Sequence, residues 1–486
     1  MKFTQPAAFS ATIKTDVLAV CVSADDPTGL PPELDQAFDG TLSKTLAEEH
    51  FTGRPGSVLA VRSLGRIPAT WVLAVGVGNW SASEHRLAAG AASNFARDKG
   101  AKTLAFATPA SGIPGERDGA LLRSVVEGTI AGNYRWDRYK GIDERKPPLA
   151  TVKLMGLHRH RQALKVAVAH GQAQSLARDL VNASAEDIYP ESLADEARKL
   201  ASRQLKVRVW DEKKILSRQM GGIHAVGKGS SRPPRFVHMT YTPSGTPQAR
   251  LAIIGKGVTF DAGGLSIKPS SGMQTMRCDM GGAATVLGVM SALDEIAPNV
   301  QVEGIFGAAE NMLGGSAYKL GDVLTMYNGK TVEIHNTDAE GRLLLADCLS
   351  YASELGVDAC IDLATLTGAA VVALGSHYTA LFTKDDEFAD TWKKRAEEAG
   401  EGIWRLPLEE LYKDKLKADW GTLKNVGGRE AGSITAALFL SEFVDGPTWA
   451  HLDIAGPAFL DSPEQYLVKG GTGAMVRTVL RWLEEY

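Results

Sequence analysis

The sequence predicts an α/β protein in which a smaller N-terminal α/β domain precedes a larger C-terminal domain with a mostly parallel, doubly wound mixed sheet. The chain of 486 residues is too long for one ordinary domain, and 44% hydrophobic residues can fill more than one core. Short apolar runs alternate with amphipathic segments, which is typical of strands alternating with helices. A polar segment with two prolines, residues 143–148, interrupts this pattern. We therefore expect domains at residues 1–161 and 162–486.

In the N-terminal domain, buried strands are expected where apolar residues run together. These runs are residues 17–22, 71–77 and 103–107, and an amphipathic helix is predicted over residues 83–99. A longer helical pattern covers residues 162–181. We expect that helix to bridge the two domains.

The alternation of strands and helices is stronger in the C-terminal domain. Strands are predicted at residues 205–210, 236–241, 251–254, 302–306, 332–335, 359–363 and 449–454. Helices are predicted at residues 281–296 and 340–355, the latter ending at Gly356, a residue type favoured just after a helix. This order predicts a doubly wound sheet, which binds ligands at the carboxyl ends of its strands.

Composition excludes several classes of protein. A net charge of −4 gives no basic excess for nucleic acid or an anionic membrane. The four cysteines have no CxxC spacing, which argues against disulfides and a thiolate zinc site. We find no apolar run long enough for a signal peptide or a membrane span. We expect a soluble, cytoplasmic protein.

One candidate site is the segment Asn336-Thr-Asp-Ala-Glu-Gly-Arg, between a predicted strand and a predicted helix. Asp338 and Glu340 could present carboxylate oxygens to divalent cations. Alternatively, Asp338 could cap the helix while Glu340 interacts with its dipole. A third interpretation is a calcium loop with Asp347 at its last position, although a strand precedes it where such loops have a helix.

A second candidate site spans Gly255 to Asp279 and follows a buried strand. Its glycines match neither the dinucleotide fingerprint, since Phe260 occupies the third glycine position, nor a Walker loop. Lys256, Asp261, Lys268 and Asp279 lie in this apolar, glycine-rich context. Because unpaired charges are costly to bury, such a set indicates metal binding or a structural cluster of salt bridges.

Together these motifs resemble those of the leucyl (cytosol) aminopeptidases, peptidase family M17. The segment from Asn336 to Leu343 is identical to the family signature, and the segment from Gly255 resembles the family's other metal-binding block. Further similarity occurs around Glu310, Gly321, Asp362 and His451. The resemblance covers about residues 165–486, whereas the N-terminal domain resembles the family only in size and pattern. Ala262 and Leu313-Gly-Gly depart from the family pattern without removing a ligand.

The resemblance implies a role for each matching residue. Asp261 and Glu340 would bridge two divalent metal ions (zinc, manganese or magnesium), Asp338 would hold one of them, and Lys256 and Asp279 would complete the other. Lys268 and Arg342 would be catalytic, with a bicarbonate at Arg342 as general base. The pocket for the first substrate side chain would be lined by Met276, Thr365 and Gly368.

The implied activity is hydrolysis of N-terminal residues, with Leu and Met preferred, from short peptides. Two metals about 3.5–4 Å apart can acidify a bridging water, which would attack the peptide carbonyl. A homohexamer is implied by the resemblance alone. Two other classes stay open: a two-metal phosphoester hydrolase, and a DNA-binding role on this scaffold, which the charge does not support.

Overall fold

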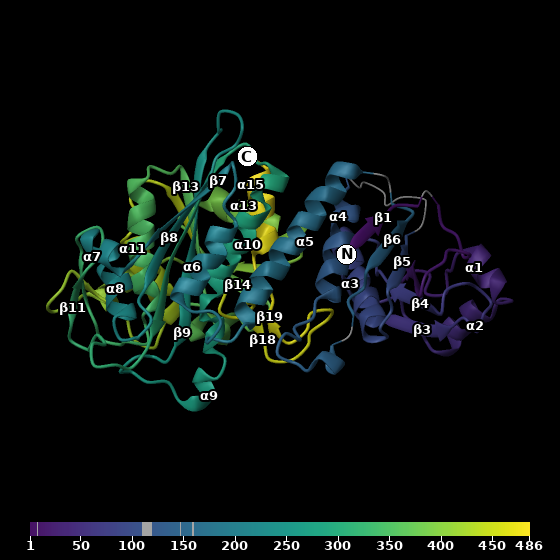
Figure 1. The fold of residues 1–486 in the computed structure, drawn as a ribbon, viewed down its shortest axis with the longest axis horizontal. Coiled ribbons are helices and arrows are strands. Elements are labelled where there is room, and N and C mark those ends of the chain that lie inside the picture. The colour runs from purple at the N-terminus through teal and green to yellow at the C-terminus, as the bar shows by residue number, and fades with distance from the viewer. Residues whose placement is uncertain (7, 109–118, 146, 158–159) are drawn as a thin grey trace. The chain divides into compact units, whose positions relative to one another are not determined.

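A computed structural model describes residues 1–486 except residues 7, 109–118, 146 and 158–159. The chain forms two compact units (Figure 1). The N-terminal unit is Met1–Ser175 with Ser462–Lys469, and the C-terminal unit is Leu176–Asp461 with Gly470–Tyr486. The boundary falls within α5 (Arg161–Asn182), the helix predicted over residues 162–181.

The N-terminal unit contains a six-stranded sheet in the order β1-β6-β5-β2-β4-β3, parallel except for the β3–β4 pair. Its strands are β1 (Lys2–Thr4), β2 (Val17–Val22), β3 (Val58–Arg62), β4 (Trp71–Gly76), β5 (Thr103–Ala107) and β6 (Thr151–Met155). Its helices before α5 are α1 (Pro32–Ala37), α2 (Thr41–Glu48), α3 (Ala82–Asp98), α4 (Ala120–Asn133) and the short η1 (Ile142–Glu144).

Strand β2 is apolar throughout because both faces of this sheet are covered. Val17 and Ala19 belong to a core that includes residues of α3 and α4, whereas Leu18 and Val20 belong to a second core with residues of α1 and α2. Alternate residues of a strand point to opposite faces, so a continuous apolar run is needed here. The three predicted strands and the predicted helix are therefore confirmed.

The C-terminal unit is built on an eight-stranded mixed sheet in the order β15-β14-β17-β13-β9-β10-β8-β7. The β17-β13-β9-β10 centre is parallel, and antiparallel pairs join β14 to β17, β10 to β8 and β8 to β7. These strands are β7 (Leu205–Trp210), β8 (Arg235–Tyr241), β9 (Arg250–Asp261), β10 (Gln301–Asn311), β13 (Ala359–Ala364), β14 (Tyr378–Phe382), β15 (Gly402–Arg405) and β17 (Thr448–Asp453). The predicted mostly parallel mixed sheet is confirmed.

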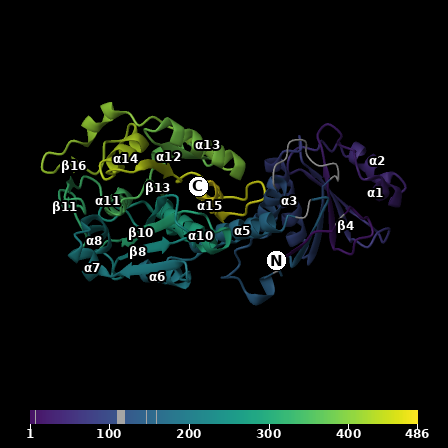
Figure 2. The same ribbon diagram turned by 90° about the horizontal axis from the view of Figure 1, so that it is seen from above.

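The helices of this unit pack on both faces of the sheet, and Figure 2 shows α12, α13 and α14 together at one side. Opposite faces of β9 carry α10 and α11: a Cβ at Gly255 would meet the start of α10, whereas Ala252 and Ile254 share a core with α11. The helices are α6 (Pro190–Lys199), α7 (Glu212–Ser217), α8 (Gly221–Gly227), α9 (Ser270–Met273), η2 (Met276–Met280), α10 (Gly281–Ile296), α11 (Gly341–Glu354), α12 (Gly368–Leu374), α13 (Asp386–Ala399), η3 (Glu410–Leu416), α14 (Gly432–Ser441) and α15 (Val476–Glu484).

One predicted strand lies outside the main sheet. The strand expected at residues 332–335 is β12 (Thr331–Glu333), which joins β11 (Val323–Thr325) and β16 (Leu423–Lys424) in a separate three-stranded sheet. A further pair is formed by β18 (Phe459–Leu460) and β19 (Gly470–Gly471). Asp338 and Glu340 therefore follow a strand of the small sheet, and not the carboxyl end of a main-sheet strand. Within the described residues, no helix is long and apolar enough to cross a membrane.

Candidate active site

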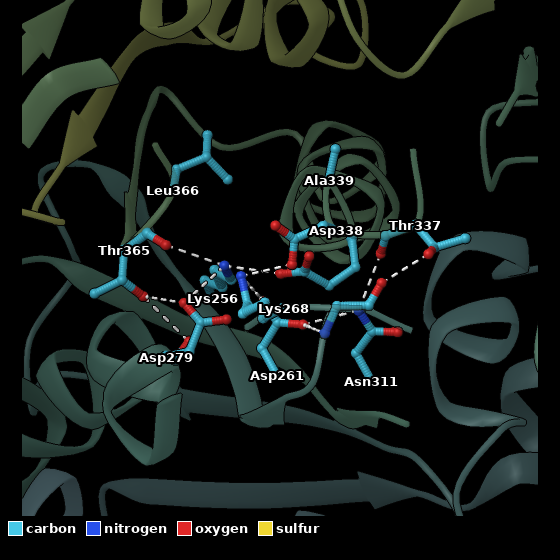
Figure 3. A network of polar contacts seen from close by, with 12 residues as sticks. Lys256, Asp261, Lys268, Asp279, Asn311, Thr337, Asp338, Ala339, Thr365 and Leu366 are labelled. Atoms are coloured by element: carbon cyan, nitrogen blue, oxygen red, sulfur yellow. Dashed lines mark hydrogen bonds and ion pairs between the residues drawn. The ribbon is translucent and has the colours of Figure 1, made fainter. Parts of the chain in front are cut away.

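The central strand β9 supplies two of the predicted site residues, Lys256 and Asp261. Their spacing of five would place them on opposite faces of a regular strand. However, Val258 pairs with Ala309 and Phe260 with Glu310, so Thr259 is an extra residue in a β-bulge. The bulge shifts the alternation by one residue, and Asp261 consequently points to the same side as Lys256 (Figure 3).

The loop after β9 turns back on itself and brings Lys268 to the site. Gly263 and Gly264 have φ values of 86° and 63°, a backbone conformation that favours glycine. The Lys268 amide donates to the Ala262 carbonyl at 3.0 Å, which closes the loop. The Lys268 ammonium then lies 2.9 Å from Asp261 Oδ2 and 2.5 Å from Asp338 Oδ1.

Asp338 and Glu340 come from the loop between β12 and α11. The Thr337 hydroxyl donates to the Gly263 carbonyl at 2.7 Å, and the Ser266 amide donates to the Thr337 hydroxyl at 2.8 Å, so this loop is joined to the β9 loop. Glu340 is the N-cap of α11 without a side-chain capping bond. The interpretation of Asp338 as the helix cap is therefore wrong.

Lys256 lies between the carboxylates of two different segments. Its Nζ is 2.8 Å from Asp279 Oδ1, 2.9 Å from Glu340 Oε1 and 3.0 Å from the Thr365 carbonyl oxygen (Figure 3). Asp279 lies in η2, immediately before α10. The structure thus brings together all of the predicted ligands, Lys256, Asp261, Asp279, Asp338 and Glu340, with Lys268 among them.

The donor set fits divalent cations. One oxygen each of Asp261, Asp338 and Glu340 lies within 4.8 Å of the others, the arrangement that a shared cation requires. Among the described residues, the buried atoms Asp279 Oδ2 and Glu340 Oε2 have no hydrogen-bond partner. Buried carboxylate oxygens without a partner are costly, and a metal ion would satisfy them.

The electrostatics of this cluster favour added positive charge. Burial raises the pKa of Asp279 and of Glu340, and repulsion from neighbouring carboxylates adds to the shift. Burial lowers the pKa of Lys256, but Asp279 and Glu340 raise it by more, so the net shift is upward. All three groups therefore hold their protons tightly, and in this cluster four carboxylates face only two ammonium groups. A dication bound by Lys256 would have to displace the lysine proton.

Arg342 lies in the first turn of α11 with its guanidinium buried. One of its terminal nitrogens donates to the Asn425 carbonyl at 2.8 Å, whereas Nε has no partner among the described residues. Burial lowers the pKa of Arg342 to about 10, with Glu340 and Asp453 opposing the shift. The group therefore stays charged at neutral pH and has an unused donor for an anion.

The structure places two of the three residues predicted for the substrate pocket, Met276 and Thr365, near Asp279. Met276 is half-buried in the same short helix, η2. The Thr365 hydroxyl donates to Asp279 Oδ1 at 2.8 Å, just beyond β13. Gly368, the first residue of α12, is exposed, and a Cβ there would meet nothing within 4 Å. The structure thus leaves open space beside Gly368.

The calcium-loop interpretation is wrong. Asp347 lies inside α11 and is fully buried, and its two oxygens accept from the amides of Ile223 and Tyr327, each at 2.9 Å. Both oxygens therefore face backbone donors in the core. Asp347 joins α8 and the β11–β12 turn to α11 instead.

Three residues of the site were missed by the sequence reasoning. Asn311 donates to Asp261 Oδ1 at 2.8 Å and to the Thr337 carbonyl at 3.0 Å. The Tyr318 hydroxyl donates to the same carbonyl at 2.7 Å, and the Asn425 side-chain amide donates to the Asn336 carbonyl at 2.6 Å. Only Asn311 had a signal, because it belongs to the Glu310-Asn-Met segment that resembles the family.

Comparison with known proteins agrees with this geometry. The model for the catalytic domain of the cytosol aminopeptidase family matches residues 175–480, and that for its N-terminal domain matches residues 17–142. The chain is 44% identical over 452 residues to a probable cytosol aminopeptidase of Aquifex aeolicus, covering 91% of this chain and 90% of the relative. It is 43% identical over 476 residues to a probable cytosol aminopeptidase of Nostoc punctiforme, covering 96% of each.

Two solved structures are also similar. A mutant of tomato leucine aminopeptidase superposes with a TM-score of 0.91 at 33% identity, covering 100% of this chain and 97% of that one. The bottromycin maturation enzyme BotP in complex with Mn superposes with a TM-score of 0.86 at 38% identity, covering 97% and 99%.

The fold and the site, with these relatives, define a hydrolase that cleaves peptide bonds. More narrowly, the chain belongs to the cytosol aminopeptidase family, and its activity is that of an aminopeptidase. The match at residues 17–142 extends the family likeness to the N-terminal domain, beyond the size and pattern seen in the sequence alone.

Proposed function

We propose that this aminopeptidase uses two divalent metal ions to release apolar N-terminal residues, with Leu and Met preferred, from short peptides. The observation that carries the proposal is the convergence of Asp261, Asp338 and Glu340 within 4.8 Å, beside Lys256 and Asp279. A bound pair of cations would supply Lewis-acid polarisation of the peptide carbonyl and activation of water. The Mn of the BotP complex supports a divalent ion, and we propose zinc, manganese or magnesium for this chain.

The proposed ligand roles are those implied by the resemblance to the cytosol aminopeptidases. Asp261 and Glu340 would be shared by both ions, whereas Asp338, whose oxygen lies within 4.8 Å of theirs, would bind one ion. Lys256 as the free amine and Asp279 would complete the other. Buried carboxylates of this number would neutralise most of the charge of two dications.

Lys268 and Arg342 are proposed as catalytic residues rather than ligands. The Lys268 side chain is partly exposed and could donate to the oxygen that becomes negative as the peptide carbonyl is attacked. Arg342 has an unused buried donor and could hold a bicarbonate that removes a proton from the attacking water. The planar guanidinium suits such an anion better than an ammonium would.

Substrate choice would depend on Met276, Thr365 and Gly368. An apolar, open pocket discriminates between similar side chains by only ~1–3 kcal/mol per methylene, so broad activity toward apolar first residues is expected. A panel of aminoacyl-anilides tests this, and a strong preference for acidic first residues would contradict it.

The proposed metal dependence is tested with chelator-treated protein and a leucyl-anilide substrate. Activity should be absent without metal and return with Zn²⁺, Mn²⁺ or Mg²⁺, and metal analysis of protein purified without chelator should give two ions per chain. A phosphoester tested on the same preparation is the comparison substrate for the alternative reaction class. Failure of all three ions to restore peptide hydrolysis would refute the proposal.

We further propose a homohexamer located in the cytoplasm. The proposal rests on membership of the cytosol aminopeptidase family. Location can be checked by fractionation of cells that produce the protein.

A further inference from the structure

A buried asparagine holds the loop that carries Asp338 in place. Asn425 follows β16, which pairs in parallel with β12, and its side chain is fully buried. The loop in question is residues 335–339, whose Thr337, Asp338 and Ala339 are seen in Figure 3. Asn425 is not part of this loop but forms hydrogen bonds with it. Among the described residues, it forms no ion pair or hydrogen bond with the side chain of a proposed metal ligand.

The Asn425 amide uses both of its ends on the loop backbone. Its Oδ1 accepts from the His335 amide at 2.9 Å and from the Asn336 amide at 3.3 Å. Its Nδ2 donates to the Asn336 carbonyl at 2.6 Å and to the Ala339 carbonyl at 3.4 Å. These are the loop residues on both sides of Asp338, so one side chain fixes the backbone before and after that carboxylate.

The backbone of Asn425 bonds to the two elements that flank the same loop, β12 and α11. Its amide donates to the Glu333 carbonyl at 3.0 Å, and its carbonyl accepts from Arg342 at 2.8 Å. Hydrogen bonds in a site closed to water are strong, and losing one partner leaves the other group unpaired. Because the side-chain bonds of Asn425 hold the backbone before and after Asp338, replacing this side chain should first change the position of the Asp338 carboxylate.

We propose that Asn425 is a positioning residue that sets the affinity of one of the two metal positions, the one to which Asp338 contributes. The inference rests on the proposed two-metal function. Lys256 and Asp279 come from other segments, so the second position should depend much less on Asn425. Residues that orient metal ligands typically change metal affinity 10–100-fold when they are replaced.

The test is a calorimetric titration of chelator-treated protein with Mn²⁺. Asn425→Ala should weaken one of two binding steps by about 10–100-fold and leave the other within a few-fold. The weakened step should be the one that Asp338→Asn also weakens. Asn328→Ala, at an exposed asparagine on the β11–β12 turn, is the matched control and should bind as the unchanged protein does.

Asn425→Asp covers the case in which Asn425→Ala does not fold. The aspartate keeps the size and the acceptor side, but its second oxygen faces and repels the Asn336 and Ala339 carbonyls, so a loss at the same step is expected again. Unchanged Mn²⁺ binding by either folded variant would overturn the proposal. So would equal weakening of both steps with a lower melting temperature of the metal-free protein, which would indicate a general structural role. If the unchanged protein binds no Mn²⁺, the titration is repeated with Zn²⁺ and Mg²⁺, and the proposed function itself fails if none of the three ions binds.

Discussion

The Asp261 carboxylate divides its two oxygens between the protein and the site. Oδ1 accepts from the Gly263 amide at 2.9 Å and from Asn311, whereas Oδ2 faces Lys268. The first set of bonds fixes the direction of the second oxygen. At the scale of single residues, Asp261 is proposed to bind metal and the neighbouring Lys268 to act on the substrate, and substitutions should distinguish these two roles.

Asp261→Asn should lose metal and activity together. The amide keeps the size of the side chain but removes the negative charge that two cations would share, so both should bind more weakly. Metal content by mass spectrometry and the rate of leucyl-anilide hydrolysis would be measured on the same sample. Asp390→Asn, on the exposed face of α13, is the control and should change neither quantity.

Arg342→Ala should separate metal binding from catalysis. Its guanidinium donates to a backbone carbonyl and forms no hydrogen bond or ion pair with a proposed ligand side chain among the described residues, so both ions should remain bound. The rate should fall by roughly 10²-fold or more, the usual scale for lost general-base assistance. Arg342→Lys should not restore it, since an ammonium lacks the planar fork. Loss of metal from Arg342→Ala would show that the assigned role is wrong.

At the scale of secondary structure, the start of α11 is shaped by its close approach to Lys256. A Cβ on Gly341 would lie 2.3 Å from Cε and 2.7 Å from Nζ of that lysine. The lysine would have to move away from Asp279 and Glu340. Position 341 therefore needs a glycine because the Lys256 side chain leaves no room for a Cβ, and not because of the backbone angles at this position.

Gly341→Ala should reduce metal binding without reducing the stability of the helix. Alanine favours a helix over glycine by about 1 kcal/mol, so unfolding is not the expected defect. Calorimetric titration with Mn²⁺ should show a weaker step, while the melting temperature of the metal-free protein stays the same or rises. Gly315→Ala, where a Cβ would meet nothing within 4 Å, is the control. Full metal affinity in Gly341→Ala would contradict the importance of this contact.

The pattern of apolar residues predicted most main-sheet strands of the C-terminal unit because buried parallel strands are apolar throughout. The same pattern predicted strands shorter than β9 and β10, because the carboxyl ends of these two strands carry polar residues of the site. The bulge at Thr259 has no apolar signature, so the convergence of Lys256 and Asp261 could be inferred only from the family resemblance. Asn425 was not predicted because its role depends on a β12–β16 contact between segments about 90 residues apart.

At the scale of the whole molecule, a buried network connects β8 and β10 with α11. Glu303 accepts from His238 and Thr240, each at 2.7 Å, and His238 also contacts the Tyr351 hydroxyl at 3.0 Å. Burial raises the pKa of Glu303, but hydrogen bonds from His238, Gln301 and Thr240 lower it by more, so the net pKa is about 2. The ionised carboxylate therefore stabilises the fold.

Glu303→Gln should destabilise the protein in a pH-dependent way. Because the folded pKa lies below the ordinary value of 4.5, this stabilisation is fully present above pH 4.5 and is lost as the pH falls toward 2. The shift corresponds to about 3 kcal/mol at neutral pH. Urea unfolding at several pH values should show a gap between the two proteins that narrows below pH 4.5. A gap that stays constant down to pH 3 would contradict this assignment.

The proposed hexamer predicts a particle about six times the 51.8 kDa of the chain. Sedimentation velocity at micromolar protein would measure this directly. A single species at the mass of one chain would refute the hexamer without affecting the proposed chemistry.

The division of the chain into units has a consequence for synthesis on the ribosome. Residues 462–469 belong to the N-terminal unit, where the Tyr466 ring packs so closely on Gly90 that a Cβ there would lie 2.4 Å from it. Everything else in that unit precedes residue 176. The N-terminal unit must therefore wait for almost the whole polypeptide to emerge before Tyr466 can cover Gly90, and a nascent chain released before residue 462 would carry an uncovered helix surface at α3.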